Sequence, residues 1–199
     1  PEEYVNILTS GSIEAANVAN NHSSDYGEQS FTDTLAVLDK ADIAHFGYEQ
    51  VNILKMGDVN IGLTGIYELA EHMEKEQQVK ENIAALKKEG ADLIIVNFHW
   101  GTEREYTPNE TQKALAHLAI DEGADLVIGH HPHVLQGIEK YKDKYIAYSL
   151  GNFCFGGNSN PEDKDTMIFQ QTFTITKKGN VKKDDDINII PCSISSSGG

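Results

Sequence analysis

The pentapeptide Glu-Gly-Ala-Asp-Leu occurs twice in this chain, at residues 89–93 and again at residues 122–126. Each copy follows a stretch with apolar residues at helical spacing and leads into a short apolar run, so each closes a helix and opens a buried strand. We interpret the two copies as the same helix-to-strand loop used twice. Helices that alternate with buried strands are typical of a sheet with parallel strands, so the repeat indicates an α/β fold.

The segments around the repeat extend this alternation and then end it. Helical spacing of apolar residues predicts helices over residues 1–8, 28–40, 71–89 and 108–122. Short apolar or alternating runs predict strands over residues 13–19, 43–46, 51–55, 59–66, 92–98 and 125–129, and then over 134–139, 145–150, 166–176 and 181–190. We therefore expect alternating strands and helices first, followed by a run of strands.

Length and charge limit the kinds of partner that the chain can have. Its 199 residues suffice for one domain with a sizeable core. A formal net charge of -15 repels nucleic acid, which is not expected as a partner. No apolar run is long enough to span a membrane, and the start Pro-Glu-Glu-Tyr indicates a fragment or a processed product. Cys154 and Cys192 do not have the spacing of a metal site.

A group of histidines follows the apolar run at residues 125–128. His130, His131 and His133 lie where a strand is expected to end, and open α/β proteins place their chemistry in such loops. Pro132 favours an extended conformation for His131, which predicts that His131 and His133 point to the same side and that His130 faces away. Paired imidazoles suit Zn, Mn, Fe or Ni. The alternative is a pair of surface histidines around a turn proline.

Two other expected strand ends carry histidines. Asn21 and His22 lie in the polar loop over residues 20–27, and His99 follows the apolar strand over residues 92–98. In a sheet of parallel strands such loops share one edge, so the three groups of histidines can form one metal-centred site. The alternatives are that His22 caps the following helix and that His99 is a structural histidine under Trp100.

Four motifs, taken in order, make a family resemblance specific. They are Ala-Asn-Asn-His-Ser-Ser-Asp-Tyr-Gly (19–27), His-Trp-Gly-Thr-Glu (99–103), His-Pro-His-Val-Leu-Gln (131–136) and Tyr-Ser-Leu-Gly-Asn-Phe (148–153). They resemble the signatures of capsule and poly-γ-glutamate biosynthesis proteins of the CapA type, a family similar to the calcineurin-like metallophosphoesterases. The resemblance implies a single domain over residues 1–199, with an α/β, metallophosphoesterase-like sandwich of two mixed β-sheets flanked by helices.

The resemblance also implies roles for individual residues. The metal ligands that it implies are Asn21, His99, His131 and His133. His22 resembles the histidine that contacts the substrate phosphate and acts as general acid, and we expect Asp25 to orient an imidazole beside the metal. Glu103 and Asn152 match motif positions and are expected to line the site. His130 matches a variable position of the motif.

This family resemblance implies a divalent metal, Mn, Zn or Fe, and hydrolysis of a phosphoester. The family carries a strand with a metal-bridging Asp, and a further acidic motif, before the Asn-His loop. The chain starts after that region. We therefore expect at most one bound metal, although the intact protein could hold two, and a fold that lacks its N-terminal strand.

Three functions remain open at this point. The chain can be a metal-dependent, hydrolase-like protein of poly-γ-glutamate capsule biosynthesis, a non-catalytic accessory or binding subunit of the capsule synthesis and export machinery, or a phosphoesterase for an unrelated small substrate. The resemblance implies the capsule polymer or its synthase subunits as partners. It also implies a location at the extracytoplasmic face of the bacterial membrane, held there by a segment that this chain does not contain.

Overall fold

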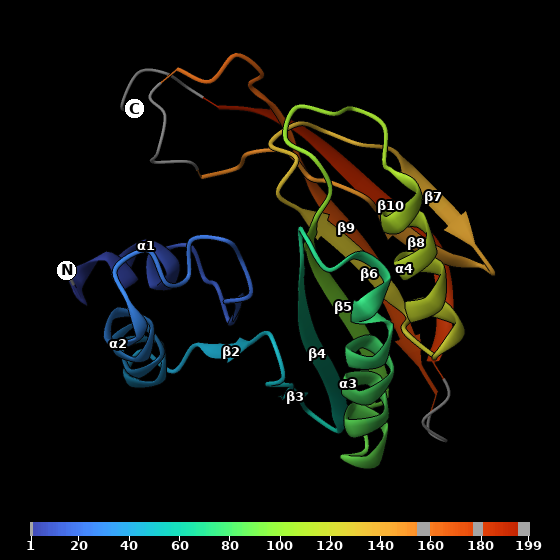
Figure 1. The fold of residues 1–199 in the computed structure, drawn as a ribbon. Coiled ribbons are helices and arrows are strands. Elements are labelled where there is room, and N and C mark those ends of the chain that lie inside the picture. Colours follow the sequence, from blue (N-terminus) through green and yellow to red (C-terminus); the bar gives the residue numbers. More distant parts are fainter. Residues whose placement is uncertain (1, 155–159, 177–180, 195–199) are drawn as a thin grey trace.

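The computed structural model describes residues 2–154, 160–176 and 181–194, and its centre is a six-stranded mixed sheet (Figure 1). The strands of this main sheet, in spatial order, are β3 (Asn52–Met56), β4 (Val59–Glu68), β5 (Leu93–Trp100), β6 (Leu126–His130), β8 (Lys144–Ala147) and β7 (Ile138–Tyr141). The four inner strands run parallel, and the two edge strands pair antiparallel with their neighbours. Parallel strands joined by helices are what the repeated pentapeptide predicted.

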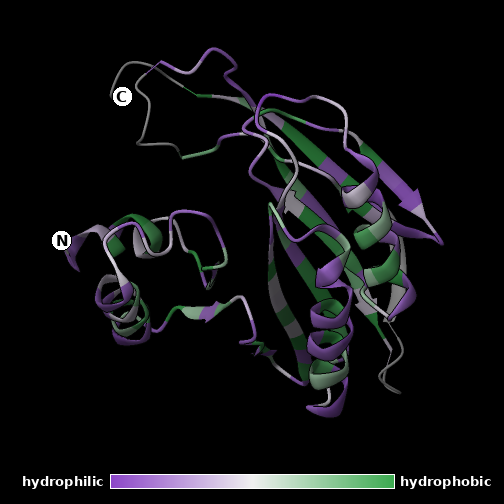
Figure 2. Cartoon of the chain, viewed as in Figure 1, coloured by the Kyte–Doolittle hydropathy of each residue, from purple (hydrophilic) through white to green (hydrophobic). Residues whose placement is uncertain are grey.

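Two helices cover one face of the main sheet. They are α3 (Glu76–Lys88), which a 3-10 turn (His72–Lys75) precedes, and α4 (Glu110–Asp121). Their apolar sides and the inner strands form the principal core, in which Leu86, Phe98, Leu115 and Val127 are fully buried. Figure 2 shows hydrophobic residues concentrated in the strands of this sheet and hydrophilic residues on the outer side of α3. Burial of this shared core holds the helices on the sheet.

A long antiparallel hairpin of β9 (Asp165–Ile175) and β10 (Val181–Ser193) forms a separate two-stranded sheet. It lies on the opposite face of the main sheet, where the ring of Phe169 meets the ring of Tyr145 edge to face, with centroids 6.4 Å apart. The expectation of an α/β protein in which helices flank a mixed sheet is confirmed.

Residues 2–46 form a smaller unit beside the main sheet (Figure 1). It contains, after a 3-10 turn (Glu2–Tyr4), the elements α1 (Val5–Ser10), β1 (Ala15–Asn17), α2 (Glu28–Lys40) and β2 (Ala44–Phe46). β1 and β2 pair in parallel, and Val18, Leu38 and Ile43 are buried between them and the helices. The unit approaches β4 very closely, because a Cβ atom at Gly65 would lie 2.1 Å from the Asn17 Oδ1. A side chain at Gly65 would therefore push the unit away.

Most predicted elements are present, with two differences of substance. The helix predicted from residue 108 begins at Glu110, because Asn109 and Gln112 form a reciprocal capping box that sets its start. The strand predicted over residues 134–139 is wrong. Residues 134–137 make one isolated bridge, Leu135 with Leu150, and β7 begins only at Ile138.

The turn expected at residues 177–180 and the end over residues 195–199 lie outside the described residues. Within the described ranges, no helix has both the length and the apolar character needed to cross a membrane.

Candidate functional site

The carboxyl ends of β4, β5 and β6 lie at one edge of the main sheet and bring three aromatic rings together. Tyr67, His99 and His130 are paired across these strands, so their side chains lie on the same face of the sheet. The prediction that His130 faces away is therefore wrong. It placed the strand end at Gly129, whereas β6 continues through His130 and keeps it in register with His99.

The turn that follows β6 is left-handed, not extended. His131 has φ 98° and His133 has φ 60°, so the expectation that Pro132 holds His131 in an extended conformation is wrong. Such φ values are uncommon for residues with a side chain and persist where other contacts fix them. Here the backbone N–H of Arg104 donates to the Pro132 carbonyl at 2.8 Å, and the Asn152 amide donates to the His133 carbonyl at 3.2 Å. These long-range contacts override the local preference.

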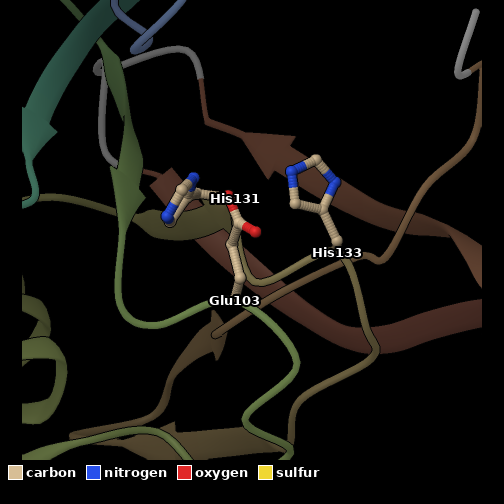
Figure 3. A group of neighbouring side chains, drawn as sticks. All are labelled: Glu103, His131 and His133. Carbon is tan, nitrogen blue, oxygen red and sulfur yellow. The ribbon is translucent and has the colours of Figure 1, made fainter. Parts of the chain in front are cut away.

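This turn brings two imidazoles and one carboxylate to a common point. Ligand atoms of Glu103, His131 and His133 all lie within 4.8 Å of one another (Figure 3). Burial lowers the pKa of His131, which keeps its ring neutral at pH 7. The buried Nδ1 of His131 has no hydrogen-bond partner among the described residues. A neutral imidazole with an unpaired buried nitrogen, beside a second imidazole and a carboxylate, fits a divalent metal.

Asn152 orients the second imidazole. Its Oδ1 lies 2.6 Å from Nδ1 of His133, so that nitrogen carries a proton and donates it to the amide oxygen. A metal-binding histidine is usually fixed in this way through its other ring nitrogen. The structure thus places Asn152, which the motif predicted only as a lining residue, in direct contact with a predicted ligand.

Asn21 and His99 are the other two predicted ligands, and they contact each other. The Oδ1 of Asn21 accepts from Nε2 of His99 at 2.9 Å, and the ring of His99 lies 4.8 Å, centroid to centroid, from that of His131. Burial, with smaller contributions from neighbouring histidines, lowers the pKa of His99 to about 3, so its ring is neutral. Because the Asn21 Oδ1 and the His99 Nε2 are hydrogen-bonded to each other, a metal that binds both atoms would have to displace this hydrogen bond.

His22 and Asp25 lie beside this pair. Nδ1 of His22 is 2.8 Å from Oδ2 of Asp25, and Nε2 of His22 accepts from the amide of Asn21 at 3.3 Å. The proton of a neutral His22 is therefore on Nδ1, toward the carboxylate. His22 can act as a general acid only after its ring has taken up a second proton.

The eight predicted site residues thus form one continuous series of contacts, and a hollow of about 480 Å³ opens beside it. This charged hollow is lined by the predicted residues His22, Glu103, His133 and Asn152. It is also lined by residues that the sequence reasoning missed, chiefly Arg104, Tyr106, Glu162 and Asp163. Arg104 is next to Glu103 in the same motif loop and could have been found. Glu162 and Asp163 lie in a segment with no motif, where Asp163 accepts from the Tyr106 hydroxyl at 2.7 Å.

Comparison with known protein families gives a match over most of the chain. The family described as bacterial capsule synthesis protein PGA_cap matches residues 1–157, a range that contains all eight predicted site residues. The chain belongs to this bacterial capsule synthesis family. The family resemblance expected from the four motifs is therefore confirmed.

Curated relatives in the capsule synthesis family carry matching names. The chain is 36% identical over 178 residues to the capsule biosynthesis protein CapA of Bacillus anthracis, covering 77% of this chain and 43% of that protein. It is 34% identical over 173 residues to the PGA biosynthesis protein CapA of Bacillus subtilis, covering 77% of this chain and 46% of the relative. A Mycobacterium tuberculosis relative, 31% identical over 166 residues, covering 68% of this chain and 43% of the relative, is named "Probable polyglutamine synthesis accessory protein". The chain spans less than half the length of each of these proteins.

One solved structure has a similar fold. A hypothetical protein from Thermus thermophilus matches with a TM-score of 0.62, over 96% of this chain and 81% of the other, at 14% sequence identity. At that identity the likeness concerns the fold alone.

Proposed function

We propose that this chain serves the synthesis of a poly-γ-glutamate capsule through a divalent metal site at the edge of its main sheet. The capsule role is supported by membership of the bacterial capsule synthesis family and by the names of the two Bacillus relatives. The observation that carries the metal site is the convergence of Glu103, His131 and His133, with a buried nitrogen on His131 that has no hydrogen-bond partner in the described part of the chain.

Glu103, His131 and His133 are the residues that would hold the cation, with Asn21 and His99 directly beside them. One carboxylate and two imidazoles suit Mn, Zn or Fe. When bound, such a cation supplies polarisation of a phosphoryl oxygen, which makes a phosphoester the natural substrate.

The remaining side chains would position the substrate and move protons. Among the described residues, Arg104 is the only lysine or arginine that lines the charged hollow, and its guanidinium can pair with an anionic group held near His133. His22 borders the same hollow and is oriented by Asp25, so its ring can deliver a proton to a leaving oxygen once it is protonated. These roles rest on their common position around the hollow.

A second candidate is a non-catalytic accessory subunit that uses the same hollow only for binding. Two observations favour it. The Mycobacterium relative is named as an accessory protein, and the hydrogen bond between Asn21 and His99 occupies two of the predicted ligand atoms. In this alternative the partners are the capsule polymer or the subunits of its synthase.

The two candidates predict different results for hydrolysis of bis-p-nitrophenyl phosphate by the Mn-loaded protein. A hydrolase should show activity that His22→Ala lowers by a factor of roughly 10² or more, as expected for loss of a general acid. His72→Ala is a matched control, since the side chains of His22 and His72 are 68% and 67% exposed, and it should keep the activity. A metal-loaded protein without turnover would contradict hydrolysis of this substrate class and favour the accessory function.

We also place this function at the extracytoplasmic face of the bacterial membrane, which the family resemblance alone supports. Surface biotinylation of intact cells, compared with lysed cells, tests the location of the full-length protein. Labelling only after lysis would contradict it.

A further inference from the structure

A second hollow, also of about 480 Å³, lies on the other side of His133 and Asn152. One part of its lining consists of the histidines His99, His130, His131 and His133. The apolar side chains of the lining are Leu150, Phe153, Met167, Ile168 and Phe169, and Gly151, Asn152 and Cys154 also line the hollow. We call it the apolar hollow, in contrast to the charged hollow that contains Arg104 and Glu103. Its volume is in the range of pockets that bind small organic ligands.

The apolar wall is a built part of the fold. Its two segments, residues 150–154 and the start of β9, are held together by hydrogen bonds from Met167 N at 3.3 Å and from the Thr166 hydroxyl at 2.8 Å, both to the Leu150 carbonyl. Gly151 permits this close approach, because it has φ 71° and a Cβ there would lie 2.6 Å from the Asp165 carbonyl oxygen. These contacts hold the two segments of the wall against each other.

Two apolar side chains of this wall are exposed. Phe153 is 61% exposed and Ile168 is 37% exposed, although both lie beside polar residues of the candidate site. Covering exposed apolar surface of this kind with an apolar group is energetically favourable.

The two hollows meet at the hydrogen-bonded pair of His133 and Asn152, which lines both of them. A group anchored at His133 can therefore extend in two directions. On one side it meets Arg104 and acidic side chains, and on the other side it meets neutral apolar side chains. That division suits a ligand with one charged end and one apolar end.

We propose that the apolar hollow is a subsite for the hydrocarbon portion of an amphiphilic phosphate ester whose phosphate lies at Glu103, His131 and His133. The position of the phosphate rests on the proposed function. The contact of the hydrocarbon with Phe153 and Ile168 is a separate claim, which does not depend on the metal.

The test compares methyl phosphate with octyl phosphate below its micelle concentration. Binding of each is measured by calorimetry to the Mn-loaded protein and to protein treated with EDTA. Each buried methylene group strengthens binding by roughly fourfold, so octyl phosphate should bind at least about tenfold more tightly than methyl phosphate in both states. The ratio of the two affinities measures the contribution of the apolar hollow to binding, and the affinity of methyl phosphate measures the contribution of the metal site.

A matched pair of variants assigns the effect to the apolar hollow. Ile168→Ser removes a side chain that lines it, and Ile189→Ser removes the same residue type from β10, 43% exposed and outside the lining. We expect Ile168→Ser to lower the octyl-to-methyl ratio about threefold or more, with methyl phosphate unaffected and Ile189→Ser unchanged.

An equal affinity for the two phosphates would overturn the subsite, and so would a ratio that both variants lower alike. A methyl phosphate affinity that EDTA treatment leaves unchanged, with the octyl-to-methyl ratio intact, would instead refute the metal site and leave the subsite supported.

Discussion

Asn152 fixes the orientation of the His133 ring through two hydrogen bonds. Its amide accepts from Nδ1 and donates to the His133 carbonyl, so it fixes both the ring and the left-handed backbone. We expect Asn152→Ala to weaken Mn binding by roughly 10- to 100-fold, the usual cost of losing such a contact. Asn152→Asp keeps the acceptor for Nδ1 and should retain most of the affinity. Calorimetric titration with Mn measures both variants, and equal losses in the two would show that the ring contact is not what matters.

The buried histidines make the stability of the metal-free protein depend on pH. Burial lowers the pKa of His99 to about 3 and that of His130 to about 4, so both rings stay neutral in the folded protein at mildly acidic pH. In the unfolded chain the same two side chains have their ordinary pKa of 6.5 and take up protons there. Between about pH 6.5 and about pH 4 the unfolded state binds more protons, and the free energy of unfolding falls as the pH is lowered. The loss is up to about 1.4 kcal/mol per pH unit for each histidine.

Urea denaturation of EDTA-treated protein between about pH 7 and about pH 5 checks this effect. His130→Gln should reduce the loss of stability with falling pH by about one histidine's share. A pH dependence that His130→Gln does not alter would contradict the burial of a neutral ring at this position.

Two buried glutamines connect α4 to the loop that carries Glu103. Gln112, on α4, donates to Gln136 at 2.8 Å, and Gln136 donates to the Glu105 carbonyl at 2.7 Å. Their side chains are almost completely buried, so each hydrogen bond replaces one that water would otherwise make. Gln112 also packs under Gly101, where a Cβ would lie 2.8 Å from its side chain. This connection sets the position of the loop relative to the turn with His131 and His133.

Gln136→Leu removes this connection. It leaves the buried amide of Gln112 without an acceptor, which should lower the free energy of unfolding by about 1–3 kcal/mol. Because Glu103 loses its fixed position, Mn affinity should fall by roughly tenfold or more. Urea denaturation and Mn titration measure the two effects. Gln77→Leu, at an exposed position on α3, is the control and should change stability by less than about 0.5 kcal/mol. A stability loss with unchanged Mn affinity would limit Gln136 to a structural role.

Helices and strands that follow from local apolar periodicity could be predicted from the sequence. Helix α2 has the predicted bounds, and His99 lies at the end of the predicted buried strand, because apolar periodicity reports burial directly. The turn after His130 could not be predicted, since its left-handed residues are held by Arg104 and Asn152, which are distant in sequence. For the same reason the contact of Asn152 with His133 appears only in the folded chain.

The whole molecule assembles the site from parts that are far apart in the chain. The loop with Asn21 and His22 comes from the N-terminal unit, His99 lies on β5, His131 lies in the turn after β6, and Asn152 precedes the hairpin. The motif order predicted this set of residues, but it carried no signal for the segment with Glu162 and Asp163, which closes the charged hollow. Those acids lie in a chain of net charge -15, whose field repels a polyanionic ligand.

Metal content after incubation with Mn or Zn and desalting tests the central claim most directly. We expect about one equivalent per chain in the native protein and in His72→Ala, and none in His131→Ala/His133→Ala, since that variant removes both imidazoles of the site. Circular dichroism of the double variant checks that it is folded. A native protein without metal, or a folded double variant that keeps it, would contradict a metal site at Glu103, His131 and His133.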